Sequence, residues 1–279
     1  MSFLELFDET LDINSTENYE LSVELSPDNL SFCILDTIRN KFIMLRSSQP
    51  ESDKKFSADE LGEMIRKDDF LSRKYKKVNA VTPSPKFTVV PAPLFDPGRK
   101  DEYFLFNHIL QENHIILVNK LNVPDSFLVY SQPITMNDLL KNAWPNVHPH
   151  HHLKPFFEHL TTYAKSPNDH LHIHVEHDFF NLILYSNNIL TFCNSFTYRS
   201  ISDILYYTLN TFKSLDVKQE ATIFLSGLVE RKNDLYSSLV IYVRHIKFAE
   251  PSGNFTYSYA LNETDLFRYI NLISVVNCG

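Results

Sequence analysis

Histidines are the most concentrated chemically active side chains in this sequence. Nine of the twelve lie between His148 and His177. Imidazole nitrogens bind zinc, nickel and copper, and the alternation of His170, His172 and His174 places all three on one face of a strand. The pattern is typical either of a metal site or of a polar strand face beside a connector.

A metal site usually takes ligands that converge from several elements, with cysteine or carboxylate among them. The sequence contains neither an HExxH motif nor a CxxC pair, so we expect no bound metal. We expect the run His148–His152 to be an exposed part of a connector. Metal binding by the histidines is the less favoured alternative.

A locally basic segment spans residues 66–77, with Phe70 and Tyr75 among its lysines and arginines. Such a segment could contact RNA or an anionic protein, although lysines at a helix end also complement the helix dipole. The chain has 26 basic and 34 acidic side chains, a net charge of −8. Because nucleic-acid affinity depends on cationic contacts to phosphate, we expect no nucleic-acid partner.

The sequence lacks the common motifs of nucleophilic and phosphate-binding enzymes. No GxSxG, Walker A or GxGxxG pattern occurs, and only five glycines are present. Cys33 and Cys193 lie in apolar stretches, where cysteine most often acts as a small core residue. We therefore expect no cofactor and no catalytic residue of these classes.

The elements that would position these residues repeat along the chain. Residues 21–36 and 171–186 align without a gap at an offset of 150, so that Asp28 matches Asp178. Each stretch begins with an alternating strand, continues through a short polar turn and ends in a more continuously apolar strand. A third strand follows in both cases, which predicts two three-stranded meanders.

A helix and a further strand follow each meander. Ser57 precedes Glu60 by three residues and Ser200 precedes Asp203 by three, which is the spacing of a capping box, and apolar residues then recur at helical spacing. The order β-β-β-α-β therefore occurs twice and predicts an α/β fold of two duplicated lobes. Additional helices are expected around 101–110, 135–144, 233–245 and 263–274.

The repeat predicts four parts of the chain. We expect an N-terminal segment at 1–16, a first lobe at 17–145 and a second lobe at 170–279. Residues 146–169 contain prolines, histidines and other polar residues, which favours a connector there.

Cysteine usage and the N-terminus predict a cytoplasmic protein. Three cysteines at long spacings give no disulfide framework, which fits a reducing compartment. Met1–Glu5 carries an acid where a signal peptide carries bases. No stretch approaches the roughly 20 apolar residues of a membrane span, so we expect no membrane association.

Five stretches carry a resemblance to a known family. They are Tyr19–Val23, Phe87–Phe95, His150–His152, Phe179–Leu184 and Leu225–Gly227. In these stretches the chain resembles an uncharacterised Bacteroidetes family, a domain of unknown function with the actin-like ATPase fold, which is a duplicated ribonuclease H-like architecture. The resemblance covers nearly the whole chain and implies two actin-like lobes, but no established activity.

The resemblance also indicates where nucleotide would bind. Actin-like ATPases hold phosphates in the first turn of each lobe, usually Asp-x-Gly, and the matching positions here are Asp28 and Asp178. The adenosine-binding glycine matches Gly227. Pro27 removes an N–H from the first turn, and Phe179–Phe180 occupy the second turn where the backbone should approach phosphate.

These departures favour a protein that has lost the nucleotide-binding loops. We expect a non-enzymatic interaction or scaffold protein with an actin-like ATPase fold and a protein partner whose identity the sequence does not give. The alternative is a residual nucleotide-dependent ATPase or kinase-like enzyme that uses Asp28, Asp178 and Gly227.

Overall fold

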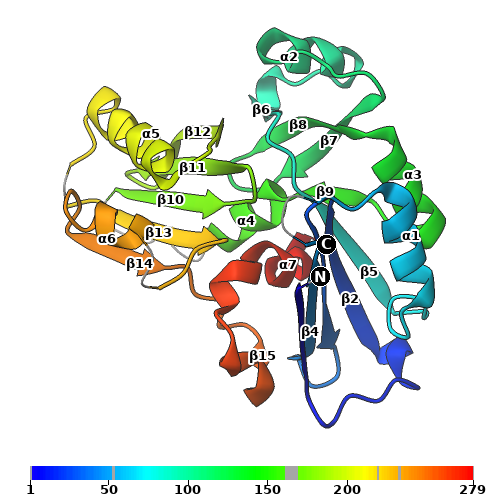
Figure 1. The fold of residues 1–279 in the computed structure, drawn as a ribbon. Helices are drawn as coiled ribbons and strands as arrows, with labels where there is room; N and C mark the ends of the chain where they lie inside the picture. The colour runs from blue at the N-terminus through cyan, green and yellow to red at the C-terminus, as the bar shows by residue number, and fades with distance from the viewer. Residues whose placement is uncertain (1, 52–53, 161–168, 219, 232–233, 279) are drawn as a thin grey trace. The chain divides into compact units, whose positions relative to one another are not determined.

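A computed structural model describes residues 2–51, 54–160, 169–218, 220–231 and 234–278 (Figure 1). Contacts divide the chain into two compact units. The first unit contains residues 1–159, 252–265 and 271–279, and the second contains 160–251 and 266–270.

The main sheet of the first unit has seven strands in the order β1-β4-β3-β2-β5-β9, with β15 beside β4. The strands are β1 (Ser2–Phe7), β2 (Tyr19–Ser26), β3 (Asn29–Asp36), β4 (Lys41–Gln49), β5 (Lys77–Thr82), β9 (Pro149–His151) and β15 (Thr256–Tyr257). Strands β1 to β4 pair antiparallel, whereas β5 runs parallel to β2 and β9 runs parallel to β5.

Two helices cover one face of this sheet. They are α1 (Ala58–Lys67) and α3 (Ile134–Ala143), which lie side by side along β5 and β2 (Figure 1). Alternate residues of the strands, such as Leu21, Val23 and Ile34, are fully buried against Leu61 and Leu140 of the helices. The expected capping box begins α1: Glu60 N–H donates to Ser57 Oγ, and Ser57 N–H donates to Glu60 Oε2.

The C-terminal residues cover the opposite face. Val275 and Cys278 of the 3-10 helix η7 (Val275–Cys278) pack against Val81 of β5. Cys33 donates its thiol hydrogen to the carbonyl of Leu272 over 3.7 Å, and burial raises its pKa. Cys33 is therefore a core residue, as expected.

A separate three-stranded sheet, ordered β6-β8-β7, follows β5 along the chain. Its elements are β6 (Phe87–Pro91), α2 (Lys100–Asn107), β7 (His114–Leu121) and β8 (Ser126–Pro133). Phe104 of α2 is fully buried against Val90, Ile116 and Val129. The sequence predicted β6 and α2 but not the β7–β8 hairpin, whose short apolar runs lack a period that distinguishes strand from helix.

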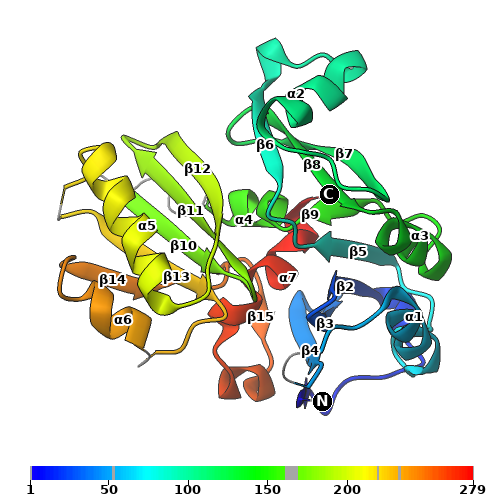
Figure 2. The same cartoon turned by 45° about the horizontal axis from the view of Figure 1, so that its top comes forward.

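The second unit contains one sheet in the order β12-β11-β10-β13-β14. Its elements are β10 (His170–Val175), β11 (Phe179–Ser186), β12 (Ile189–Thr197), α5 (Ile201–Ser214), β13 (Thr222–Gly227), α6 (Asp234–Leu239) and β14 (His245–Phe248). Helix α5 lies across this sheet (Figure 2), and Tyr207 of α5 stacks on Phe196 of β12 at a ring distance of 4.4 Å.

The two units repeat one β-β-β-α-β arrangement. The order β4-β3-β2-β5 in the first matches β12-β11-β10-β13 in the second. Leu21 lies opposite Ile34, and Leu171 lies opposite Leu184, so the register is the same at an offset of 150. The register shift that follows Ile34 recurs after Leu184. The predicted fold of two duplicated β-β-β-α-β units is therefore confirmed.

The contacts divide the chain differently from the expected ranges. The segment 1–16 includes β1, which pairs with β4. The expected connector 146–169 includes β9 and α4 (Leu153–Leu160), and its residues 161–168 lie outside the described residues. The stretches 252–265 and 271–279 of the expected second lobe join the first unit.

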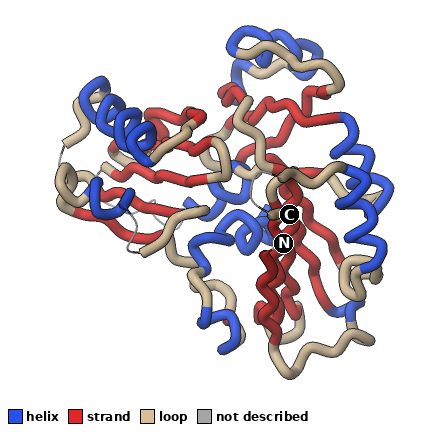
Figure 3. Tube along the Cα trace, in the orientation of Figure 1, coloured by secondary structure: helices blue, strands red, loops and turns tan. Residues whose placement is uncertain are grey.

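Figure 3 shows where the helices, strands and loops of the chain lie. The remaining helices are short: η1 (Thr16–Asn18), η2 (Ala92–Leu94), η3 (Pro97–Arg99), η5 (Tyr259–Glu263), η6 (Leu266–Tyr269) and α7 (Ile270–Ser274). Among the described residues, no helix has the length and hydropathy needed to cross a membrane.

Candidate functional site

Asp28 and Asp178 occupy equivalent turns of the two units. Ser26 pairs with Asn29 across β2 and β3, so Pro27 and Asp28 alone form the turn. In the second unit Glu176 N–H donates to the carbonyl of Phe179 over 2.9 Å, which closes the turn around Asp178. Both turns are therefore two-residue hairpins.

The turn at Asp28 uses its polar groups internally. Asp28 N–H donates to Ser26 Oγ over 3.2 Å, and Pro27 has no N–H to offer. The Asp28 carboxylate is 13% exposed and lies 3.4 Å from Lys55 Nζ. The turn therefore presents an ion-paired acid rather than a set of free backbone donors.

The turn at Asp178 is held by Tyr198. Tyr198 N–H donates to the carbonyl of Asp178 over 3.2 Å, and its hydroxyl donates to the carbonyl of Glu176 over 2.7 Å. Phe179 and Phe180 are 5% and 0% exposed. Both belong to β11, where successive side chains point to opposite faces of the sheet, and both rings are buried in the second unit.

Gly227 has a structural reason to be glycine. Its φ is +79°, and a Cβ at this position would lie 2.1 Å from the carbonyl oxygen of Val175. The same oxygen accepts a hydrogen bond of 2.7 Å from Leu228 N–H. Only glycine permits this close approach of β13 to β10.

The structure brings two of the three predicted residues together. Gly227 is the register partner of Val175, and Asp178 follows Val175 by three residues, so both lie at the carboxyl ends of β10 and β13. Asp28 lies at the corresponding edge of the sheet of the first unit, after the carboxyl end of β2.

Comparison with known proteins identifies the family. A profile of the family described as protein of unknown function (DUF3822) matches residues 8–246. The chain belongs to this family. No curated protein matches the chain.

Solved structures agree on the fold of this DUF3822 member. A protein of unknown function with an actin-like ATPase fold from Bacteroides thetaiotaomicron VPI-5482 is 23% identical, with a TM-score of 0.77 over 94% of this chain and 98% of its own. The predicted resemblance to a Bacteroidetes family of unknown function is thereby confirmed.

Two more distant structures share the same fold. A chain of the PilM–PilN type IV pilus biogenesis complex is 10% identical, with a TM-score of 0.60 over 93% of this chain and 98% of its own. The ethanolamine utilization protein EutJ from Carboxydothermus hydrogenoformans is 7% identical, with a TM-score of 0.50 over 94% and 90%. The DUF3822 chain therefore has the actin-like ATPase fold.

The prediction that His148–His152 is an exposed connector is wrong, because His151 and His152 are fully buried. His151 Nε2 lies 2.9 Å from the carbonyl of Ser84, and its Nδ1 accepts from Leu153 N–H over 3.2 Å. Since a carbonyl only accepts, His151 is the neutral Nε2–H tautomer. Burial and the neighbouring His152 lower its pKa well below the usual value.

The alternating histidines of β10 are also buried. His170, His172 and His174 are 1% to 2% exposed, rather than forming the polar strand face expected from the sequence. His170 stacks on Tyr185, and His172 stacks on Phe224 at 4.9 Å. Among the described residues, no group of three or more histidine, cysteine or acidic side chains is arranged to hold a metal ion.

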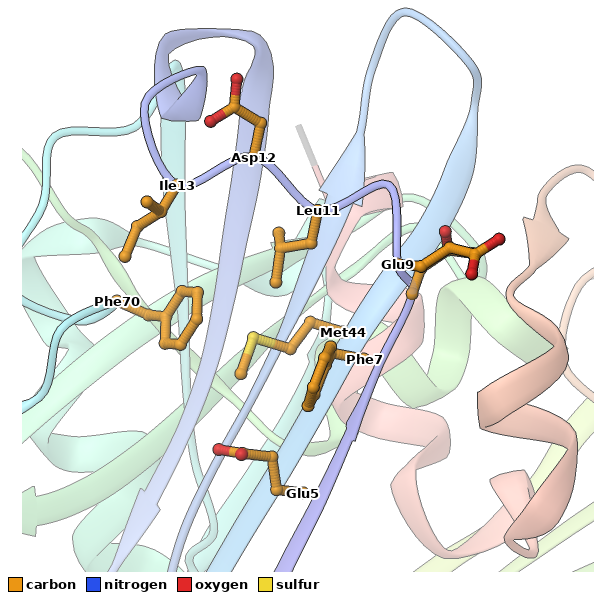
Figure 4. A pocket seen from close by; sticks show the side chains of 9 residues that line it. Glu5, Phe7, Glu9, Leu11, Asp12, Ile13, Met44 and Phe70 are labelled. Atoms are coloured by element: carbon orange, nitrogen blue, oxygen red, sulfur yellow. The ribbon is translucent and has the colours of Figure 1, made fainter.

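A pocket of about 420 Å³, which we call the N-terminal pocket, lies beside the edge strand β1. It is lined by residues within 5–13 together with Met44 and Phe70. Figure 4 shows the side chains of Phe7, Leu11 and Met44 gathered at its centre, whereas the carboxylates of Glu9 and Asp12 point outward. No local sequence pattern predicts this site, because it forms only when β1 pairs with β4.

Proposed function

We propose that this protein has lost the nucleotide chemistry of its fold and acts as a non-enzymatic interaction or scaffold protein. The construction of the two phosphate turns carries the proposal. Neither turn contains glycine, the first has Pro27 and a Lys55–Asp28 ion pair, and both are closed as tight hairpins. An ATP cradle needs several backbone N–H groups directed at phosphate oxygens without Cβ atoms in the way.

The energetic consequence is large. A hydrogen bond to a charged group contributes about 1.5–3 kcal/mol. The loss of three or four such contacts weakens binding by several orders of magnitude, since each 1.4 kcal/mol corresponds to about tenfold. Asp178 alone does not replace them, because a carboxylate repels phosphate unless a cation bridges the two.

The N-terminal pocket is the surface that best fits a protein partner. Its centre is apolar, and Phe7 is 54% exposed. Glu9 and Asp12 are exposed at its border, so a segment with alternating apolar and basic side chains is the complementary ligand. β1 is the terminal strand of the sheet order among the described residues, which favours addition of a partner strand.

The fold is compatible with such a role. The structure of PilM with PilN is that of a protein complex. The alternative, a residual nucleotide-dependent ATPase or kinase-like enzyme, is favoured by one observation: Asp178 and Gly227 lie at the same sheet edge in the second unit. It requires Asp28, Asp178 and Gly227 to bind nucleotide despite the closed turns.

Isothermal titration calorimetry with Mg·ATP separates the two functions. We expect no micromolar binding that depends on Asp178, and no hydrolysis of ATP above the rate in buffer. Micromolar binding in the unmodified protein that disappears in Asp178→Ala would show that the cradle survives and that the scaffold proposal is wrong.

A peptide titration tests the partner surface. Fluorescent octapeptides with alternating leucine and lysine should bind, and those with alternating leucine and glutamate should not. Phe7→Ala should weaken binding at least about fivefold, since truncation of a buried aromatic anchor costs more than 1 kcal/mol. Phe106→Ala removes a phenylalanine that is 87% exposed on α2 and should change nothing. Equal binding to both variants would contradict the assignment of this surface.

A further inference from the structure

Two sequence features that the proposed function leaves unused meet in one cavity of the first unit. The basic segment after α1 and the residues before β9 line a pocket of about 770 Å³, which we call the basic pocket. It is lined by residues 72–79 and 143–148, together with His150 and Cys278. Its size lies within the range of about 300–1,000 Å³ that is typical of small-molecule sites.

The lining of the basic pocket is entirely free of acids. Arg73, Lys74, Lys76 and Lys77 contribute four positive charges, and no aspartate or glutamate lines the cavity. This composition contrasts with the net charge of −8 of the whole chain. Within the described part of the chain, none of these four side chains forms an ion pair with a carboxylate. The pocket therefore concentrates positive charge that no carboxylate of the described residues pairs with.

The contacts of the basic side chains leave their charge available. Arg73 Nε donates to the carbonyl of Asp69, and Lys76 Nζ donates to the hydroxyl of Thr37, both neutral acceptors. Glu20, the register partner of Lys77 on β2, does not line the pocket. Acids act on the pocket only from outside its lining, Asp68 on Tyr75 and Glu158 on Cys278.

A buried amide lies against the pocket. Asn79 lines the pocket and is 2% exposed, and among the described residues its Nδ2 has no hydrogen-bond partner. This Nδ2 is closed to solvent, so a ligand reaches it only if the Asn79 side chain turns. His150 also lines the pocket, and its Nδ1 is likewise unpaired in the described structure.

The charges around His150 agree with this electrostatic character. Burial, together with Lys154, Lys77 and His148, lowers the pKa of His150 to about 4. The histidine is therefore neutral at physiological pH. Each of the charged neighbours that shift this pKa is a cation or a histidine.

Aromatic and apolar side chains lie next to the cations of the basic pocket. Trp144 and Tyr75 line the basic pocket, and Trp144 also lines an adjoining pocket of about 340 Å³. Ile65 and Leu139 lie in the adjoining pocket, together with the further cation Arg66. A ligand with a charged head and a planar or apolar part would match this sequence of surfaces.

We propose that the basic pocket binds a small, multiply charged organic anion, a phosphate ester or a polycarboxylate, that carries a planar or apolar group. The lysines and Arg73 bind the charged head, and Trp144 contacts the apolar part. Neither the family nor the structural relatives assign a ligand to this site.

This site is separate from the phosphate turns of the fold. Lys77 is the register partner of Glu20 near the start of β2, whereas Asp28 follows the other end of that strand. A strand rises about 3.3 Å per residue, which puts the Lys77 end of the pocket and Asp28 roughly 20 Å apart. The His150 end is nearer, because His150 pairs with Val81, the register partner of Glu24. The cationic end of the anion pocket therefore lies toward the opposite end of β2 from the turn where the fold's nucleotide would bind.

Intrinsic fluorescence gives a direct test on the full chain. Trp144 is the single tryptophan, so its emission reports on the pocket. We expect titration with inorganic pyrophosphate or with citrate, at constant ionic strength, to change this emission with a saturable dissociation constant of millimolar or lower. Tighter binding of pyrophosphate indicates a phosphate ester as the ligand, and tighter binding of citrate indicates a polycarboxylate.

Paired variants locate the binding. Lys74→Gln with Lys77→Gln should weaken binding at least tenfold. Lys54→Gln with Lys67→Gln removes the same charge from side chains that are 74% and 77% exposed elsewhere on the first unit, and should leave binding within twofold. Circular dichroism confirms that both variants fold.

Three results would overturn the proposal. The first is no saturable response to either probe at concentrations on the order of 10 mM. The second is an equal effect of the two double variants on binding. The third is much tighter binding of a single-stranded oligonucleotide through Lys74 and Lys77. Binding of Mg·ATP that is lost in the Lys74/Lys77 variant but kept in Asp178→Ala would support the basic pocket and leave the proposed function intact.

Discussion

Replacement of Gly227 by alanine should destabilise the second unit severely. The new Cβ would lie 2.1 Å from the carbonyl oxygen of Val175, far inside contact distance, and the φ of +79° disfavours any side chain. The backbone conformation costs about 1–2 kcal/mol. Loss of the Leu228 N–H bond to Val175 costs about 0.5–1.5 kcal/mol, and the displacement of packed strands about 1–3 kcal/mol. The expected loss is roughly 3–6 kcal/mol.

Urea denaturation followed by circular dichroism measures this loss. With a slope of about 1–3 kcal/mol per molar urea, the midpoint of the second unit should fall by roughly 2 M. Fluorescence of Trp144 follows the first unit separately. Gly253→Ala is the matched control, because a Cβ there meets no atom within 4 Å, and it should change stability by less than about 0.5 kcal/mol.

The outcome also bears on the nucleotide question. If Gly227→Ala folds with the stability of Gly253→Ala, the close approach to β10 does not determine this glycine. The structural explanation of Gly227 would then be refuted, and a role of this glycine in ligand binding would be the better explanation.

Two further predictions concern the first unit. Acid should unfold it, because burial lowers the pKa of His159 to about 4 and that of His151 well below its usual value. The unfolded chain therefore binds protons that the folded chain excludes. The histidines' contribution to stability is complete above about pH 6.5, and below that pH it falls by up to about 1.4 kcal/mol per pH unit for each histidine. Equal urea midpoints at pH 7 and pH 5 would contradict this. Arg46→Met should lower the free energy of unfolding by about 1–3 kcal/mol, because Arg46 is paired with Glu5 and Asp68 in a partly buried network. The control Lys67→Ala removes an exposed ion pair and should lower it by less than about 0.5 kcal/mol. Similar urea midpoints for the two variants would contradict the network.

The duplicated fold could be predicted because it depends on local periodicity. The alternation at Leu21 and Leu171, the shared turn position of Asp28 and Asp178, and the following capping box all lie within short stretches of sequence. The structure repeats them with the same register and the same register shift. Strand alternation and helix spacing are properties of the chain itself, so they can be predicted without knowledge of tertiary contacts.

The fate of the histidines could not be predicted in this way. The run His148–His152 is polar and flanked by prolines, which is typical of a connector, yet Pro149–His151 forms β9 beside β5. His151 is buried because Ser84, distant in sequence, accepts its hydrogen bond and the rings of Phe87 and Tyr130 pack on it. Burial of a polar group depends on whether a partner is present in space, which composition does not reveal.

The sequence by itself determined the repeat, the class of fold and the absence of glycine from both phosphate turns. Tertiary structure decided the rest: that Gly227 is required by the approach of β13 to β10, and that Lys77 and His150 share one acid-free pocket. The physical reason is the range of the interactions. Backbone periodicity and turn chemistry act between near neighbours in the chain, whereas a pocket, its charge and its unpaired donors arise from residues that only folding brings together.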